Sequence, residues 1–568
     1  MFRKILDFIK EKKKIILIIL AIIVVIAILV VVLFKVGEET RKNNINDTAW
    51  LNDNIDIDKS DSLGDGISSI NTVSYVDIFN MKYQNVVNDK IEELLKDNDY
   101  TLDNPLIIYN PYGTNTLSFN VYFNTEDEVK VSYEIAVSDS QIPSYSNTLY
   151  NSEGEYATTH AYQVIGLVKD ETNNIKITCV DRDGNSEEKE FSINVPDTES
   201  GVDLKLDVTS SNIDTELENG LYAVLGHDKS FNSNVYLYDN DGILRSELPL
   251  SGYRTDRIEF IDGNMLYSYT DSGFLLVNKL GKIEKKYDFD GYSMHHDYIY
   301  NEDKNALLIL ANKDGADTIE DRVILLDLET EEVTEIVDMM DFMPEIYETA
   351  VQPEGGNTYG GDELDWIHLN SLNMVGDNDL VLSSREMSTI IYIENAYEEP
   401  SIKYLIADES VYKDTSYEDL VLDKDGDFLS QAGQHTITYM DNPDSDDTYY
   451  LAMYNNNYTR SRTRPSQDWS SYEGASTSYD EGERSMYYLY EVNEEEGTYK
   501  LVKSVDLPYS SIVSSIQNVG DNYVTSSGKN HSFGEYNSDG ILIKQFNYTS
   551  NKYAYRVFKY DFNDFWFE

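Results

Sequence analysis

Four histidines stand out in the sequence because imidazole rings can bind a metal, act as nucleophiles or carry protons. The chain has only seven histidines, yet His295 and His296 are adjacent and are followed by Asp297. His368 and His435 each stand in a stretch rich in strand-forming residues, 72 and 67 residues further on in turn. The four side chains could ligate a redox metal, supply a nucleophile with proton-transfer partners, or satisfy hydrogen bonds in a core.

Arg385 helps to choose between these chemistries. It lies within the apolar, strand-like segment 380–391. A buried arginine requires an anion nearby, and a metal site would be disfavoured by that positive charge. The combination of histidines with a buried arginine therefore favours an anionic substrate.

Composition limits the function classes. The 568 residues are 41% hydrophobic, enough for a large core, and their net charge of −58 argues against nucleic acid as a partner. The 46 tyrosines and many Asn, Asp, Ser and Thr residues favour strands joined by polar turns, so we predict an all-β protein. A single cysteine, Cys179, rules out an intrachain disulfide and is expected to be buried.

The N-terminus contains a candidate membrane anchor. Residues 15–34 form an unbroken apolar run, which is long enough to cross a bilayer as one helix. Residues 1–14 are rich in Lys and Arg, which predicts a cytoplasmic tail. No cleavage pattern follows the run, so we expect an uncleaved single-pass signal anchor with the rest of the chain outside the cell.

Three further regions follow the anchor. We predict a flexible polar stalk from residue 35 to 103, with one short amphipathic helix at 83–97. Residues 104–200 contain alternating strands typical of a small immunoglobulin-like sandwich. Residues 201–568 hold six strand–turn–strand units: "NVYLYDNDGILRSEL", "FLLVNKLGKIEKKYDF", "VILLDLETEEVTEIV", "TIIYIENAYEEPSIKYLIAD", "YYLYEVNEEEGTYKLVKSVDL" and "SFGEYNSDGILIKQF".

The recurrence of these units, about 61 residues each, favours a six-bladed β-propeller over two stacked sandwiches. In a propeller the inner strands of successive blades meet around a central channel. Histidines about one repeat apart can therefore converge on one site.

At these residues the chain resembles the arylsulfate sulfotransferases, bacterial enzymes that pass a sulfuryl group between phenols without the nucleotide donor PAPS. The resemblance is carried by "HHD" at 295–297, "DWIHLNS" at 365–371, "LSSR" at 382–385 and "GQH" at 433–435. "YNNNYTRSRTRP" at 454–465 and "ERSMYYLYEV" at 483–492 add to it. The family also has a small β-sandwich before its propeller.

The resemblance implies a role for each motif residue. His435 would be the nucleophile that carries the sulfuryl group, with His368, Asn370 and Arg385 around the sulfuryl oxygens. One residue of the HHD pair would assist catalysis: we favour His296 because it adjoins Asp297, and we assign His295 to substrate binding. The implied partners are an aryl sulfate donor and a phenol acceptor, with neither a cofactor nor a metal.

The implied chemistry agrees with the residue types. A neutral imidazole can attack sulfur to give a sulfohistidine, and a second phenol can then reverse that step. Both the nucleophile and its proton-transfer partner are best served by a pKa near neutrality. Two departures from the family pattern are "YNN" at 454–456, where the family commonly has Asp-Asn-Gly, and the acidic Glu386 beside Arg385.

Two other classes remain open on sequence grounds. One is a metal-dependent propeller enzyme whose ion is held by the histidines. The other is a surface-anchored propeller without catalysis that binds glycans through its many tyrosines.

Overall fold

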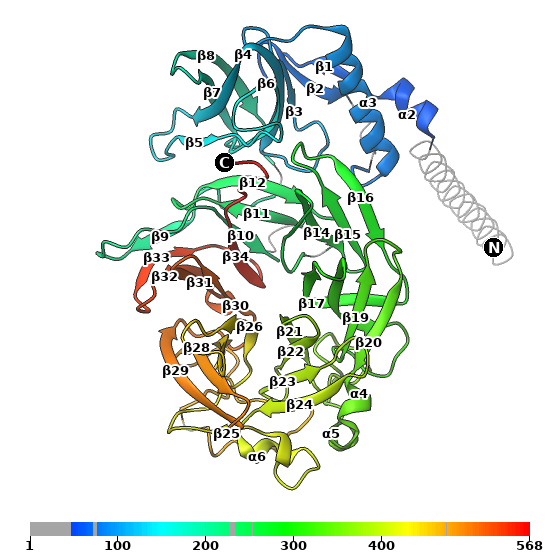
Figure 1. Ribbon diagram of the computed structural model, residues 1–568, viewed down its shortest axis with the longest axis vertical. Coiled ribbons are helices and arrows are strands. Elements are labelled where there is room, and N and C mark those ends of the chain that lie inside the picture. Colours follow the sequence, from blue (N-terminus) through cyan, green and yellow to red (C-terminus); the bar gives the residue numbers. More distant parts are fainter. Residues whose placement is uncertain (1–46, 72–76, 199, 227–232, 253, 473) are drawn as a thin grey trace, which may run out of the picture.

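The computed structural model describes residues 47–71, 77–198, 200–226, 233–252, 254–472 and 474–568. Strands dominate, and they form a smaller N-terminal domain packed on a ring of six sheets (Figure 1). The expected membrane span at 15–34 lies outside the described residues. Within the described ranges, no helix has both the length and the apolar character needed to cross a bilayer.

The N-terminal domain is built around β4 (Ser118–Ala136), a strand long enough to take different partners along its length. Its first half pairs with β3 and β6, and its second half pairs with β5 and β7. The sheet runs in the order β1-β2-β3-β4-β7-β8. Its strands are β1 (Asp56–Lys59), β2 (Ile67–Asn71), β3 (Leu106–Tyr109), β5 (Tyr145–Thr148), β6 (Ala157–Ile165), β7 (Glu171–Asp181) and β8 (Ser186–Val195).

The predicted flexible stalk is wrong for residues 48–71, which fold onto this domain. They form α2 (Thr48–Asn54), β1 and β2, and β2 extends the domain sheet by pairing parallel with β3. Leu51 and Ile55 are fully buried in a cluster with α3 (Met81–Asp97), so the segment has enough apolar surface to pack. The helix predicted at 83–97 is confirmed as part of α3, which Asn80 caps.

The predicted six-bladed propeller is confirmed. Blades 1 to 3 consist of the following strands: β10 (Leu221–Leu225), β11 (Asn234–Tyr238), β12 (Leu244–Pro249) and β34 (Arg556–Tyr560) in blade 1; β13 (Glu259–Ile261), β14 (Asn264–Thr270), β15 (Gly273–Val277) and β16 (Ile283–Asp288) in blade 2; β17 (Tyr292–Asn301), β18 (Ala306–Lys313), β19 (Arg322–Asp327) and β20 (Val333–Asp338) in blade 3.

Blades 4 to 6 continue the ring: β21 (Leu369–Val375), β22 (Asp379–Ser384), β23 (Thr389–Glu394) and β24 (Ser401–Ile406) in blade 4; β25 (Asp423–Lys424), β26 (His435–Asp441), β27 (Tyr449–Asn455), β28 (Ser485–Asn493) and β29 (Thr498–Leu507) in blade 5; β30 (Ser514–Val519), β31 (Asn522–Ser527), β32 (Ser532–Tyr536), β33 (Leu542–Asn547) and β9 (Asp207–Ser210) in blade 6. Short helices lie between strands: α4 (Met339–Phe342), α5 (Pro344–Thr349), α6 (Glu409–Tyr412), η1 (Glu418–Leu420) and η2 (Gly528–Asn530).

Each of the six repeated units found in the sequence is the outer hairpin of one blade, from β11–β12 in blade 1 to β32–β33 in blade 6. The first and last strands of the propeller segment close the ring. β34 pairs with β10 as the innermost strand of blade 1, and β9 pairs with β33 on the outer edge of blade 6. The C-terminus then reaches the N-terminal domain, where Trp566 donates from its indole nitrogen to Gln163 at 3.0 Å (Figure 1).

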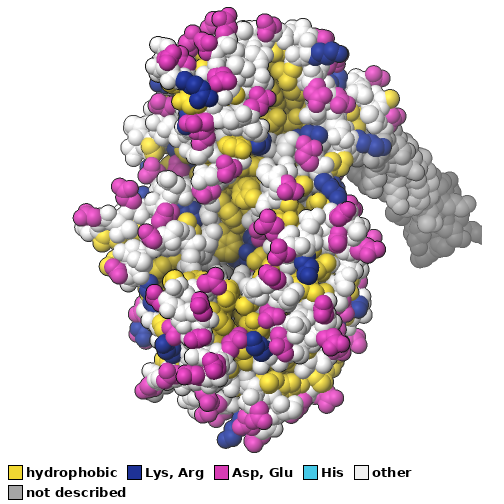
Figure 2. Space-filling view, viewed as in Figure 1, with side chains coloured by type: hydrophobic (Ala, Val, Ile, Leu, Met, Phe, Trp, Pro, Cys, Tyr) yellow, Lys and Arg dark blue, Asp and Glu magenta, His cyan; other side chains and the backbone are white. Residues whose placement is uncertain are grey.

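Acidic side chains are spread over both domains on the face shown in Figure 2, as the net charge requires. The same face is hollowed near the middle of the ring (Figure 2). Cys179 is free and buried in β7, as expected.

Candidate active site

The inner strands of blades 3, 4 and 5 share a local irregularity at the residues singled out in the sequence. β17, β21 and β26 each slip in register against the next strand at their histidine-bearing ends. His296, His368 and Thr436 have φ values of 59°, 52° and 54°, a left-handed conformation that is uncommon outside glycine. Such bulges redirect side chains, and strained backbone of this kind concentrates at functional sites.

His435 begins β26 and is held as a neutral ring. Its Nδ1 lies 2.8 Å from Asn456 Oδ1 and 3.1 Å from the Gly433 carbonyl oxygen, and both of these atoms can only accept. Nδ1 therefore carries the hydrogen, and Nε2 keeps its lone pair. Burial, with Arg385 adding to it, lowers the pKa of His435 to about 3.

Asn456 owes its orientation to two further hydrogen bonds. Its Nδ2 donates to the Ser510 carbonyl oxygen at 2.7 Å and to Ser514 Oγ at 3.1 Å. Because the amide nitrogen donates to these two residues, the amide oxygen is the end that faces His435. Asn456 is fully buried, so water does not compete for its Oδ1.

His368, just before β21, has the opposite electrostatic setting. Its Nδ1 lies 2.8 Å from Asp365 Oδ2 and also contacts Glu320 Oε2. Burial and Arg385 lower the pKa of His368, but Asp365 and Glu320 outweigh them and raise it to about 9. His368 is therefore an imidazolium at neutral pH, with Nε2–H free of hydrogen bonds to the described residues.

The expectation of near-neutral pKa values for both reacting histidines is thus not met. The two rings differ because one is enclosed by amide and carbonyl oxygens and the other by carboxylates. Environments that push the pKa values of neighbouring groups apart assign one as base and the other as acid.

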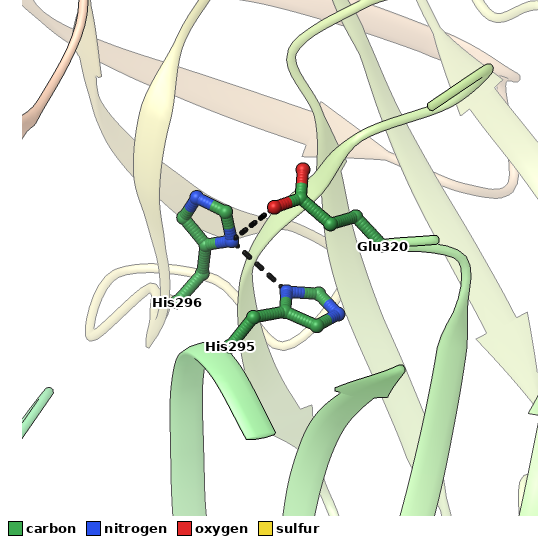
Figure 3. A group of neighbouring side chains, drawn as sticks. All are labelled: His295, His296 and Glu320. Atoms are coloured by element: carbon green, nitrogen blue, oxygen red, sulfur yellow. Dashed lines mark hydrogen bonds and ion pairs between the residues drawn. The ribbon is translucent and has the colours of Figure 1, made fainter. Parts of the chain in front are cut away.

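His295 and His296 both lie in the cluster (Figure 3). Their Nδ1 atoms are 2.9 Å apart, and His296 Nδ1 is 3.6 Å from Glu320 Oε1. The ring of His296 meets that of His368 edge-on, with centroids 4.9 Å apart. Burial lowers the pKa of His295 to about 4 and that of His296 well below its usual value, so both rings stay neutral.

Asp297 does not support His296, which removes the reason given from sequence for preferring His296. Its carboxylate accepts from Arg556 at 2.6 Å and from Arg257 at 3.0 and 3.1 Å, and it forms no hydrogen bond to a histidine ring in the described chain. A third donor, the backbone N–H of Leu372, joins Asp297 to the next blade at 3.2 Å. Asp297 therefore links neighbouring blades, and the carboxylate that lies beside His296 is that of Glu320.

Arg385 is a largely buried cation beside these rings, and its guanidinium group makes few direct contacts. Its backbone N–H donates to the His368 carbonyl oxygen at 3.1 Å, which places it next to that residue. Its nearest carboxylate is Glu386, at 3.7 Å, and its Nε is buried without a hydrogen-bond partner in the described chain. Asn370 lies close by and donates one of its two Nδ2 hydrogens to the Gln434 carbonyl oxygen at 2.8 Å. A buried cation with unused donors is a receptor for an anion.

Glu386, unexpected beside Arg385, anchors a loop of blade 5. It is buried, and its Oε1 accepts from Ser461 Oγ, from the Thr463 backbone N–H and from Thr463 Oγ1 at 2.6, 2.6 and 2.9 Å. Its other oxygen faces Arg385. Glu386 therefore couples the position of loop 459–465 to the position of Arg385.

Two groups of these residues have the ligand types of a metal site: His295, His296 and Glu320, and Glu320, Asp365 and His368. In each group the ligand atoms lie within 4.8 Å of one another. The second group, however, is already balanced in charge, because Glu320 and Asp365 face the His368 imidazolium and Arg385 lies beside them. The second group thus serves proton and anion chemistry as it stands.

Two regions of the chain match known protein families. Residues 207–562 match the family described as "Arylsulfotransferase (ASST)", and residues 106–196 match "Arylsulfotransferase Ig-like domain". The chain belongs to the arylsulfotransferase family. Membership makes this protein a sulfotransferase and confirms the immunoglobulin-like character of its N-terminal domain. The family is one of enzymes, so it does not support the alternative of a non-catalytic propeller that binds glycans.

Other comparisons add little to the sulfotransferase assignment. No curated protein matched the sequence. Crystal structures of putative 6-phosphogluconolactonases from Bacteroides uniformis and Bacteroides fragilis are 11% and 12% identical, each with a TM-score of 0.33. Each match covers 77% of this chain, and 100% and 99% of those chains.

The sulfotransferase site contains residues that sequence reasoning did not assign. Glu320 comes from the turn before β19, where nothing in "DTIEDRVILL" distinguishes it from the other acids. Asp365 stands in "DWIHLNS", three residues before His368, but nothing in that spacing assigns it a role. Asn456 stands out in the sequence only as part of "YNN", a departure from the family pattern. The residues that were assigned, His295, His296, His368, Asn370, Arg385 and His435, all lie on the inner strands or strand ends of blades 3 to 5.

Proposed function

We propose that the protein transfers a sulfuryl group from a phenolic sulfate ester to a phenol through a sulfohistidine on His435, without PAPS. The observation that carries the proposal is the neutral, buried His435, whose Nδ1–H is held by Asn456 and Gly433. That arrangement leaves Nε2 as a nucleophile. Because burial lowers the pKa of His435 to about 3, the ring does not need to lose a proton before it attacks at neutral pH.

In the first half-reaction the Nε2 lone pair of His435 forms a bond to sulfur as the bond from sulfur to the aryl oxygen breaks. The departing oxygen keeps the bonding electrons and takes the proton from His368 Nε2. The pKa of His368, about 9, is well matched to a phenol, whose pKa is about 10. Phenol leaves, His368 is neutral, and His435 carries the sulfuryl group on a ring that retains its Nδ1–H.

The second half-reaction reverses these events with another phenol. Neutral His368 takes the proton from the acceptor hydroxyl, the acceptor oxygen bonds to sulfur, and the electrons of the nitrogen–sulfur bond return to His435. Asp365 and Glu320 stabilise the proton each time it is on His368. The transferred group is thus passed on with no net change in the enzyme.

Arg385 and Asn370 supply donors for the sulfuryl oxygens. Sulfuryl transfer has a loose transition state with charge on the non-bridging oxygens, so fixed donors contribute more than any covalent help. Arg385 keeps its Nε–H without an acceptor in the described structure, and Asn370 keeps one amide hydrogen. His295 and His296 remain neutral, whereas Arg385 and His368 carry positive charge toward the anionic ester.

A burst experiment tests the proposal. Residues 36–568 are mixed with a chromogenic aryl sulfate in the absence of acceptor. We expect a burst of about one phenol per protein and a mass gain of one SO3 group on the peptide that contains His435, with digestion kept at neutral or alkaline pH. His435→Ala should show neither burst nor turnover. Kinetics that require donor and acceptor to be bound together, with no adduct on any histidine, would refute the two-step route.

We further infer that residues 15–34 anchor the protein in the cell membrane and that the propeller acts outside the cell. The support is the apolar run and the basic residues before it.

A further inference from the structure

The loop that follows β27 carries an unusual concentration of positive charge for this protein. Arg460, Arg462 and Arg464 alternate along the chain in "TRSRTRP", although acidic residues outnumber basic ones by 103 to 45. In the described part of the chain, none of the three arginines has a carboxylate within ion-pair distance. With so many acids available, three unpaired arginines side by side indicate a surface kept open for an external anion.

The contacts that the three arginines do make are to uncharged atoms. Arg462 donates to Thr358 Oγ1 and to the Gly356 carbonyl oxygen, each at 3.0 Å. Arg464 donates to Thr349 Oγ1 at 2.9 Å and also contacts the Ile346 carbonyl oxygen. Arg460 is exposed and makes no hydrogen bond to the described residues. These contacts orient two guanidinium groups without neutralising them.

The residues between the arginines fix the loop to the reaction site. Ser461 and Thr463 both donate to Glu386, which in turn lies 3.7 Å from Arg385. None of the three arginines forms an ion pair with Glu386 in the described chain. The loop that carries them is therefore held directly beside the cation of the reaction site.

All three arginines line a cavity of about 610 Å³. Its wall includes the three arginines together with Trp469, Pro353 and Glu354. A partly exposed indole and a proline ring beside guanidinium groups suit a flat aromatic ligand that bears negative charge. The volume is ample for one substituted benzene ring.

The cavity adjoins the entrance to the histidine cluster. Arg462 holds Thr358, whose hydroxyl lies 3.4 Å from Asp365 Oδ2, the partner of His368. The next residue, Tyr359, donates to the buried Glu320 at 2.6 Å although 67% of Tyr359 is exposed. The exposed Tyr359 therefore connects the surface loop that Arg462 contacts to the carboxylate beside His296 and His368.

We propose that this cavity binds a second anionic group on the phenolic substrate, a carboxylate or a sulfo group carried on a spacer away from the reacting oxygen. The inference rests on the proposed sulfuryl transfer and names the substrate class: aromatic phenols, or their sulfate esters, that bear an additional negative charge. Donor and acceptor share the requirement because both half-reactions use one site.

The net charge of the protein makes this proposal sharply testable. A molecule of charge −58 repels anions in general, so an acceptor should lose efficiency when it gains a carboxylate. Preference for the anionic acceptor requires a local basic site that overcomes the general field.

The experiment compares 4-alkylphenols with the same phenols ending in a carboxylate, over spacers of one to four carbons, with a fixed aryl sulfate donor. We expect at least one carboxylate to exceed its neutral counterpart at least fivefold in kcat/KM. Arg460→Gln should reduce that preference at least fivefold. The matched control is Arg484→Gln, an exposed arginine of the same blade that is paired with Asp506 at 2.9 Å, and it should retain the preference. No preference at any spacer length, or equal effects of the two variants, would overturn the proposal.

Binding without turnover separates this inference from the proposed function. Benzene-1,4-disulfonate, which contains no transferable ester, should quench part of the tryptophan fluorescence in a saturable manner. The quenching should vanish in Trp469→Phe and weaken at least fivefold in Arg460→Gln. Saturable quenching in a protein that shows no sulfuryl transfer would support the anion site and refute the proposed function. Sulfuryl transfer without quenching would support the proposed function and refute the anion site.

Discussion

Replacement of Asn456 by alanine tests whether the tautomer of His435 controls the reaction. The substitution removes the 2.8 Å acceptor of the Nδ1 hydrogen and leaves only the Gly433 carbonyl oxygen at 3.1 Å. Loss of such a hydrogen bond, with a buried donor left poorly satisfied, costs about 1–3 kcal/mol. Because each 1.36 kcal/mol is a factor of ten in rate, attack by His435 should slow by about 5- to 150-fold.

The assay is the rate of the phenol burst in the absence of acceptor. Asn456→Ala should lower the burst rate while the amplitude stays near one per site, because the nucleophile is still present. The control is Asn457→Ala: this buried neighbour also donates to backbone carbonyls, of Gly474 and Arg484, but it does not contact His435. If a folded Asn456→Ala protein keeps a burst rate within twofold of the wild type, or if Asn457→Ala slows the burst equally, the tautomer argument fails.

Three further outcomes are expected. Arg385→Lys keeps the charge but loses the planar donor pair, so kcat/KM should fall by about 2–4 kcal/mol of transition-state stabilisation, and near-normal turnover would exclude Arg385 from the site. Transfer should be constant through neutral pH and decline as pH rises through about 9, where His368 loses its proton, with His368→Gln abolishing that limb. Protease added to intact cells should release the propeller if residues 15–34 anchor it outside; full protection in accessible cells would contradict that orientation.

The propeller was predictable because its signal is local and repeated. Each outer hairpin has alternating apolar residues around a polar turn, and each of the six forms the outer half of one blade. The placement of His368 and His435 on neighbouring blades follows from that repeat. The segment 48–71 was not predictable, because its polar composition hides the few residues, such as Leu51 and Ile55, that pack against α3.

Much of the site chemistry depends on contacts that no local pattern records. Glu320 reaches the histidines from a turn of the same blade, and Asn456 reaches His435 across blade 5. Adjacency in sequence is a poor guide to pairing for the same reason: Asp297 adjoins His296 but pairs with Arg556 and Arg257. The pKa values of His368 and His435 diverge only because different groups surround two chemically identical rings.

The last strand of the chain gives the protein a built-in order of assembly. Arg556 in β34 is fully buried; it holds Asp297 beneath the HHD pair and donates to the Asn370 carbonyl oxygen at 3.2 Å. A ribosome makes β34 after every other strand of the ring, so a nascent chain can hold all its histidines and still lack the brace that sets two of its blades. Sulfuryl transfer should therefore begin only after β34 has been made and has joined blade 1, and a chain that lacks β34 should be inactive.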